Sequence, residues 1–206
     1  MSKKPTSAVV VPSPKSTFSS TLNIPFEHPV TSLSISPLGN EAVLAAKRGL
    51  YIINLENPFE SPKILHHLSK WDVADCAWNP HISRQEWIVT TSNTKALIWN
   101  VHRESASSKS HVEFVLNKHL RAISDIHWSP FLPELVATCS YDAYVHLWDL
   151  RTSSEKPSMS FCGWNAGATQ VKFNRVNEYL LASSHDTDVR IWDSRKGIHS
   201  LLSLLI

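Results

Sequence analysis

The sequence predicts an all-β fold made of repeated units, and three observations lead to this prediction. First, an alternating apolar segment recurs four times and ends at Ile53-Asn54, Trp99-Asn100, Trp148-Asp149 and Trp192-Asp193. Second, the spacings between these landmarks, 46, 49 and 44 residues, stay close to one period. Third, the period within a unit is two residues, and no stretch reads as a capped amphipathic helix. Three or four short strands in such a unit are typical of a β-propeller blade.

A second landmark keeps the same phase through all four units. It occurs at Ile35-Ser36-Pro37, Trp78-Asn79-Pro80, Trp128-Ser129-Pro130 and Phe173-Asn174-Arg175. Together the two landmarks place a propeller segment at 23–196, with blades at about 28–60, 61–105, 106–155 and 156–196. We expect an incomplete propeller, an open arc of about four blades, because propellers normally close with more of them.

The two ends of the chain do not share the repeat. Residues 1–22 are rich in Ser, Thr, Pro and Lys and lack a sustained apolar period, which predicts a disordered tail. Residues 197–206 do not read as a fifth unit. We therefore expect a non-repeat C-terminal end, left by truncation of a longer propeller.

Composition narrows the class of protein. The 206 residues are 42% hydrophobic, which supports a core and excludes wholesale disorder. The formal net charge is only +2 and basic residues are scattered singly, so nucleic acid is not an expected partner. Cys76, Cys139 and Cys162 have neither disulfide-framework nor metal-site spacing, which indicates a reducing compartment. No apolar run is long enough to span a membrane, so we expect a cytoplasmic protein without direct membrane insertion.

The Trp-Asp ends of units three and four resemble the WD-repeat family, with Lys118-His119 as a histidine-containing blade start. In that family a histidine, a hydroxyl residue, a turn aspartate and the tryptophan form a buried hydrogen-bonded tetrad. The resemblance implies such a structural tetrad in unit three, at His119, Thr138, Asp142 and Trp148.

The other units depart from this pattern. Unit four keeps Asp186 and Trp192, which implies a partial lock, but Ala182 stands where the hydroxyl is expected. Unit two has Val89 at that position, and unit one has Ile53 in place of the tryptophan. The internal tetrads of the first two blades are therefore in doubt, because a buried polar group needs partners.

Histidines invite catalytic or metal-binding interpretations, and the sequence argues against both. His119 with Asp142 could be a general base and its orienting group, but the repeat assigns the pair to a blade. His66 and His67 are adjacent, so a strand would direct their rings to opposite faces. The sequence contains no phosphate-binding glycine loop, nucleophile elbow or zinc-protease motif. We expect no enzyme, no cofactor and no metal.

Two short motifs suggest an alternative function. Trp148-Asp149-Leu150-Arg151 and Trp192-Asp193-Ser194-Arg195 resemble the Trp-Asp-x-Arg pattern of WD proteins that dock onto adaptors of cullin-type ubiquitin ligases. This resemblance makes Arg151 and Arg195 candidate docking residues of a substrate receptor. The same pattern also occurs as ordinary blade chemistry.

Longer stretches resemble the WD-repeat protein fifty-nine family. They include Asn57-Pro58-Phe59-Glu60, Ser69-Lys70-Trp71-Asp72, Gly167-Ala168-Thr169-Gln170-Val171-Lys172 and Ser184-His185-Asp186-Thr187-Asp188-Val189. That family supplies a subunit of the second GATOR subcomplex in animals and of the Seh-associated (SEA) complex in fungi. The resemblance implies a non-enzymatic protein–protein scaffold that relays amino-acid status to TOR complex one. It also implies Seh- and Sec13-type propellers as partners, and a peripheral position at the vacuolar or lysosomal membrane.

Overall fold

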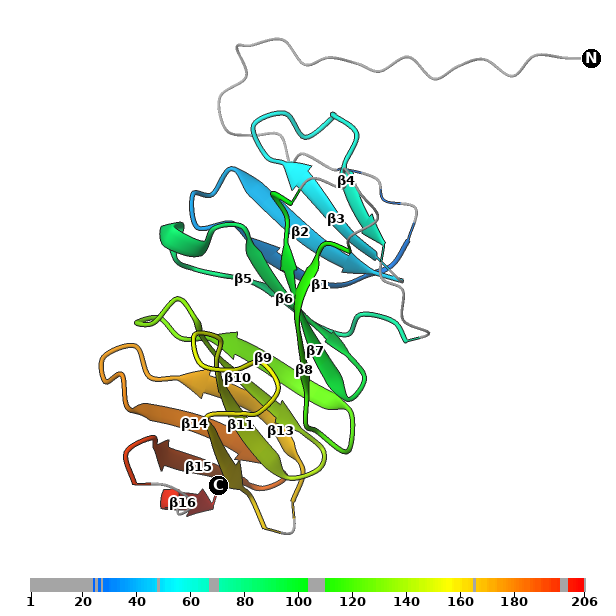
Figure 1. Ribbon diagram of the computed structural model, residues 1–206. Helices are drawn as coiled ribbons and strands as arrows, with labels where there is room; N and C mark the ends of the chain where they lie inside the picture. The colour runs from blue at the N-terminus through cyan, green and yellow to red at the C-terminus, as the bar shows by residue number, and fades with distance from the viewer. Residues whose placement is uncertain are drawn as a thin grey trace, which may run out of the picture.

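The computed structural model describes residues 24, 26, 28–47, 49–66, 71–103, 110–164 and 166–196, together with the backbone of 200–205. In this part of the chain, sixteen strands form four antiparallel sheets of four strands each, stacked as successive blades (Figure 1). The all-β, open propeller expected from the sequence is confirmed. The predicted tail at 1–22 lies outside the described residues.

Each blade contains four consecutive strands, and each strand pairs with its neighbour in the sequence. Blade one has β1 (Val30–Ile35), β2 (Glu41–Ala46), β3 (Gly49–Asn54) and β4 (Lys63–His66). Blade two has β5 (Cys76–Trp78), β6 (Trp87–Ser92), β7 (Lys95–Asn100) and β8 (Val112–Asn117). Blade three has β9 (Ile123–Trp128), β10 (Leu135–Ser140), β11 (Tyr144–Asp149) and β12 (Met159–Cys162). Blade four has β13 (Ala168–Phe173), β14 (Leu180–His185), β15 (Asp188–Asp193) and β16 (Ser200–Leu205).

The predicted blade boundaries differ from these sheets in one consistent way. The strands β4, β8 and β12 pair with the third strand of the preceding unit, although the repeat had assigned them to the next unit. The segment 197–206, expected as a non-repeat end, contains β16, which pairs with β15. The two landmarks mark the first and third strands of a blade. The fourth strand carries no landmark, so only its hydrogen bonds assign it.

Apolar side chains fill the three interfaces between neighbouring blades. Leu50 and Ile52 of blade one pack with Trp78 and Trp99 of blade two. Between blades two and three, the Trp87 and Trp128 rings are stacked with their centroids 6.3 Å apart. Between blades three and four, Phe161 and Trp192 lie 5.1 Å apart. The five tryptophans that the repeat landmarks mark, Trp78, Trp99, Trp128, Trp148 and Trp192, therefore all belong to blade packing, together with Trp87.

The first strand of blade one is exposed on its outer face. Ile35 occupies the strand position of Trp78, Trp128 and Phe173, which are 3% to 6% exposed because a preceding blade covers them. Ile35 itself is 53% exposed and Leu33 is 58% exposed. These two values show that the arc is open at blade one.

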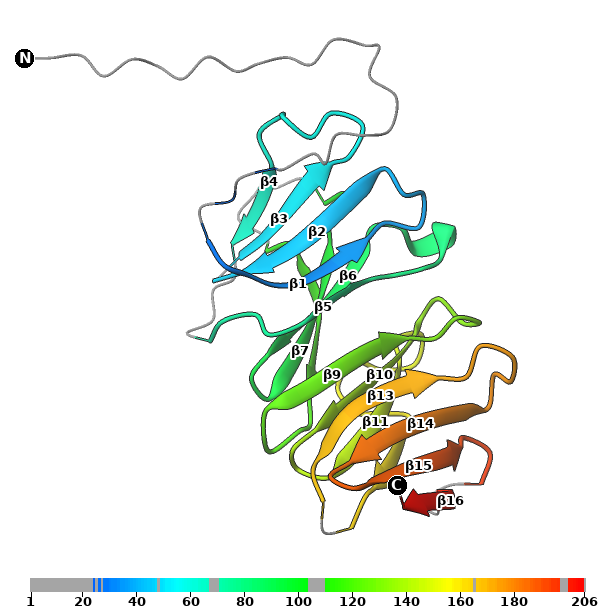
Figure 2. The same ribbon diagram turned by 180° about the vertical axis from the view of Figure 1, so that it is seen from behind.

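Two ends of the stack matter for the site. The turn end contains the β2–β3, β6–β7, β10–β11 and β14–β15 turns and the loops that enter β5, β9 and β13. The loop end contains the remaining connections, including the 3₁₀ turn Ile82–Arg84. Figure 2 shows the innermost strands β9 and β13 side by side across the interface of blades three and four. No helix in the described residues is long and apolar enough to cross a membrane.

Candidate functional site

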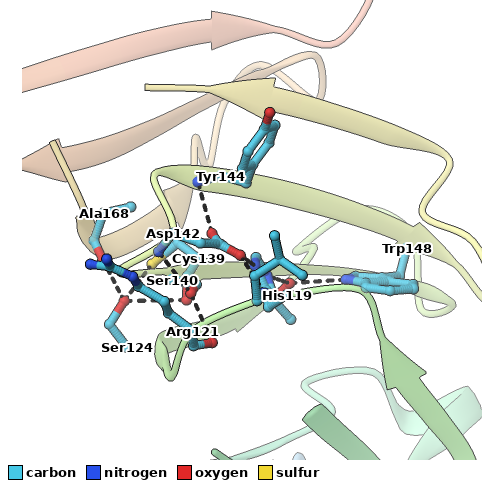
Figure 3. A network of polar contacts seen from close by, with 11 residues as sticks. His119, Arg121, Ser124, Cys139, Ser140, Asp142, Tyr144, Trp148 and Ala168 are labelled. Atoms are coloured by element: carbon cyan, nitrogen blue, oxygen red, sulfur yellow. Dashed lines mark hydrogen bonds and ion pairs between the residues drawn. The ribbon is translucent and has the colours of Figure 1, made fainter. Parts of the chain in front are cut away.

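A chain of hydrogen bonds connects His119, Thr138, Asp142 and Trp148 inside blade three (Figure 3). The Trp148 indole Nε1 donates to the Thr138 Oγ1 at 2.9 Å. The Thr138 Oγ1 lies 2.8 Å from the His119 Nε2, and the His119 Nδ1 lies 3.0 Å from the Asp142 Oδ2. Because an ionised carboxylate only accepts, the His119 Nδ1–H donates to Asp142. In the neutral ring, Nε2 then accepts a hydrogen bond from the Thr138 hydroxyl.

Three donors converge on the Asp142 carboxylate. Besides His119, the backbone N–H of Leu120 donates at 2.8 Å and that of Tyr144 at 3.0 Å. Burial acts to raise the Asp142 pKa, but the hydrogen bonds from His119 and Leu120 outweigh it and lower the pKa to about 2. The His119 and Asp142 side chains are only 1% and 6% exposed. The pair is therefore a buried structural connection, inaccessible to a substrate as a general base.

Blade four has a related lock made from different residues. The Trp192 Nε1 donates to the Ser183 Oγ at 2.7 Å, and that Oγ lies 2.7 Å from the His185 Nε2. The His185 Nδ1 contacts the Ala166 carbonyl oxygen at 3.1 Å, in the role that Asp142 has in blade three. The histidine here comes from the end of a strand, whereas His119 comes from a loop.

The hydroxyl expected at Ala182 is therefore Ser183. The β14–β15 turn joins His185 directly to Asp188 through two residues, whereas the β10–β11 turn is longer. This shorter turn shifts the alignment of the preceding strand by one residue. Asp186, assigned to a partial lock, instead lies exposed in the turn with a φ of 37°.

Blades two and one have progressively fewer polar contacts at this position. In blade two the Trp99 Nε1 donates to the Thr90 Oγ1 at 2.8 Å, so the hydroxyl is Thr90 and not Val89. The turn residue Asn93 has a positive φ of 54°, and Asp186 in the corresponding turn of blade four also has a positive φ. In blade one the corresponding positions are Leu44 and Ile53, which are apolar and 8% and 7% exposed.

The candidate docking arginines lie at the loop end, each paired with its own motif. The Arg151 guanidinium contacts both carboxylate oxygens of Asp149, at 2.9 and 2.7 Å. Arg195 contacts Asp193 in the same way, at 2.9 and 2.6 Å. The Arg195 side chain and backbone N–H lower the Asp193 pKa to about 2. The two motifs are thus self-contained turns, and the structure does not bring them together with the tetrad.

Polar contacts between blades were missed by sequence reasoning. The Asp125 Oδ2 of β9 accepts from the Val171 N–H at 2.8 Å and from the Lys172 Nζ at 2.7 Å, both on β13. In the first interface, the Ser32 Oγ donates to the Asp75 Oδ1 at 2.8 Å. These partners are more than 40 residues apart in the sequence, and no short motif reports them. Within the described residues, no group of three or more His, Cys, Asp or Glu could hold a metal ion.

Comparison with known proteins identifies the repeats and the relatives. The family model of the WD domain, G-beta repeat, matches 110–149 and 155–193. Maintenance of telomere capping protein 5 of Saccharomyces cerevisiae is 46% identical over 91% of this chain and 16% of its own length. An RWD, RING finger and WD repeat-containing protein of Schizosaccharomyces pombe is 44% identical over 90% of this chain.

Human GATOR2 complex protein WDR59 is 41% identical over 81% of this chain and 16% of its own length. The chain thus spans about a sixth of the length of these relatives, within their much longer polypeptides. The repeat match and these identities agree with the blade architecture. The chain therefore belongs to the WD-repeat family, in the group that contains WDR59 and maintenance of telomere capping protein 5.

Proposed function

We propose that this chain supplies the propeller portion of a non-enzymatic scaffold subunit in a complex of the GATOR2 or SEA type. The observation that carries this proposal is the 41% identity to GATOR2 complex protein WDR59, which extends over 81% of the chain. The identity thus covers whole blades, beyond the Trp-Asp signatures that all WD repeats share. The burial of His119 and Asp142 supports a binding role, because the pair that most resembles catalytic machinery is closed to solvent.

Within that complex the expected partners are Seh- and Sec13-type propellers. The expected output is control of TOR complex one in response to amino acids, with the complex placed peripherally at the vacuolar or lysosomal membrane. A rigid stack of blades suits this role, because it presents loops at two ends for recognition while the strands stay fixed.

The alternative, a substrate receptor of a cullin-type ubiquitin ligase, has weaker support. In both candidate residues, Arg151 and Arg195, the Nε and one further guanidinium nitrogen already donate hydrogen bonds to the aspartate of the same motif. Local geometry accounts for both motifs without a partner.

Affinity purification of the tagged full-length protein tests the proposal. We expect Seh- and Sec13-type propellers to co-purify, and to remain bound when Arg151 and Arg195 are both replaced by alanine. Recovery of a cullin adaptor that is lost in this double variant, without the propeller subunits, would establish the alternative.

A further inference from the structure

A shallow pocket of about 440 Å³ opens at the turn end, between blades three and four. Leu120 and Arg121 line it from the loop that enters β9, Tyr141 and Asp142 from the β10–β11 turn, and Gly167 from the loop that enters β13. A Cβ atom at Gly167 would lie 3.0 Å from the Tyr141 Cα, so glycine allows this close approach of loop and turn. The pocket is therefore formed by elements of two blades.

The tetrad and the neighbouring Ser140 hold the backbone of this pocket, and the side chains of Leu120 and Tyr141 point outward. The Leu120 N–H donates to Asp142, and the Arg121 carbonyl accepts from the Ser140 Oγ at 3.0 Å (Figure 3). The Leu120 side chain is nonetheless 84% exposed, and Tyr141 is 52% exposed. Because the backbone that carries these outward side chains is fixed, binding has little backbone conformational entropy left to lose.

The loop that lines the pocket from the start of β9 carries two cations. Arg121 and Lys118 are exposed, and no carboxylate among the described residues pairs with either. Lys95 of blade two is also exposed, and its strand position is opposite Asn117, next to Lys118. The carboxylate of Asp142 is already satisfied by three donors. By contrast, Arg151 and Arg195 at the loop end are neutralised by their own aspartates.

We propose that this pocket binds an acidic peptide segment of a partner protein, with one aromatic or leucine side chain seated against Leu120 and Tyr141 and its carboxylates facing Arg121. Three cations are too few for the phosphate contacts of a nucleic-acid site, and the exposed apolar side chains favour a peptide anchor. Trp164, which is 70% exposed, lies two residues before the lining residue Ala166 in the loop that enters β13. This inference deepens the proposed scaffold function by assigning it a contact surface.

Synthetic peptides test the inference directly on the purified full-length protein. The probes are fluorescein-labelled Glu-Asp-Glu-Phe-Glu-Asp, its basic twin Lys-Arg-Lys-Phe-Lys-Arg and its anchorless twin Glu-Asp-Glu-Ala-Glu-Asp. We expect the first peptide to bind at least about tenfold more tightly than either twin in fluorescence anisotropy. Equal affinity for all three would overturn the proposal. Tighter binding of oligothymidylate or of phosphatidylserine vesicles would overturn it as well, in favour of a general anion site.

Two variants and one control assign the binding to this pocket. Arg121→Glu and Leu120→Ser each change an exposed side chain; only the backbone of these residues is hydrogen-bonded, to Ser140 and to Asp142 respectively, so the blade keeps its fold. Each is expected to weaken binding of the acidic peptide by at least about tenfold. Lys156→Glu makes the same charge change as Arg121→Glu at the opposite end of blade three, in an exposed loop, and should leave binding unchanged. Wild-type affinity in the Arg121→Glu variant would contradict the assignment.

The same variants separate this inference from the scaffold proposal. If the wild-type protein recovers its complex but does not bind the acidic peptide, only the pocket is wrong. If the wild-type protein recovers no propeller subunits, the scaffold role is wrong whatever the peptide does.

Discussion

Blade three and blade one share the same strand order but hold it with different chemistry. Both pair their second and third strands in a regular antiparallel register. In blade three the face toward blade two contains the buried tetrad with Trp148, which is fully buried. In blade one the same positions are Leu44 and Ile53, on the face that no described residue of a preceding blade covers. The comparison teaches that apolar strands form a blade without the tetrad. In blade three the tetrad adds a connection between the β10–β11 turn and the loop that enters β9.

Blade four shows how this connection tolerates change. It keeps the tryptophan and a hydroxyl, but it replaces His119 by a strand histidine, His185, and the aspartate by the carbonyl of Ala166. The two ring nitrogens of His185, the Ser183 hydroxyl and the Trp192 Nε1 all have hydrogen-bond partners, as buried polar groups require. Blades two and four both have a two-residue turn, and in both the hydroxyl that meets the tryptophan lies nine residues before it, whereas in blade three it lies ten residues before. The turn length thus sets which strand residue meets the tryptophan.

The largest expected effect is at the centre of the blade-three lock. Trp148→Ala removes a fully buried ring and its hydrogen bond, and we expect a loss of about 3–5 kcal/mol in the free energy of unfolding. Urea unfolding followed by fluorescence measures it. The control is Trp164→Ala, the same truncation at a side chain that is 70% exposed, for which we expect a change within about 0.5 kcal/mol. Equal losses in the two variants would contradict the role of Trp148.

Removal of the hydroxyl compares blade three with blade two. Thr138→Val leaves two buried partners, Trp148 Nε1 and His119 Nε2, without their hydrogen bonds, so we expect a loss of about 2–3 kcal/mol. Thr90→Val removes the bond from Trp99 and is expected to lose about 1 kcal/mol. Hydrogen exchange should show that each loss is confined to peptides of its own blade. A larger cost at Thr90 would reverse the order proposed here.

A substitution at Gly163 tests the lock of blade four. A Cβ atom there would lie 2.3 Å from the His185 Cε1 and 2.7 Å from its Nδ1, so Gly163→Ala must displace His185 from Ser183 and Ala166. We expect a loss of about 1–3 kcal/mol, measured by thermal unfolding. Gly49→Ala is the matched control, because its nearest atoms would be at an ordinary 3.5 Å. Similar melting temperatures for the two variants would show that His185 contributes little.

The smallest effect concerns pH. Burial and the nearby His119 lower the pKa of His146 from 6.5 to about 3, and its Nδ1 has no hydrogen-bond partner in the described structure. In the unfolded chain His146 is protonated below about pH 6.5, whereas in the folded chain it stays neutral until about pH 3. Because the unfolded state binds the extra proton, the stability of the fold decreases as pH falls through this window. We expect wild-type protein to lose about 1–2 kcal/mol more than His146→Phe between pH 7 and pH 5 in urea unfolding. Parallel pH profiles would assign the pH dependence to other groups.

Local patterns made much of the fold predictable. The two recurring landmarks indicated the first and third strands of each blade, because these strands carry their own apolar signal. The resemblance to WD repeats also predicted that one tetrad contains His119, Thr138, Asp142 and Trp148. In the structure, hydrogen bonds connect these four residues. Prediction failed where a one-residue difference in a turn shifts a strand. Ser183 and Thr90, rather than Ala182 and Val89, therefore meet the tryptophans.

The sequence by itself determined the blade as a unit, since an alternating apolar pattern and a buried tryptophan are local properties of the chain. Only the tertiary structure decided which strand closes each blade, because β4, β8, β12 and β16 are assigned by hydrogen bonds to a partner strand. It also decided the contact of Asp125 with Val171 and Lys172, and the pocket where Leu120, Tyr141 and Gly167 meet. These features join residues that are distant in sequence. The energies of these contacts depend on interatomic distance and burial, and neither quantity can be obtained from the repeat pattern of the sequence.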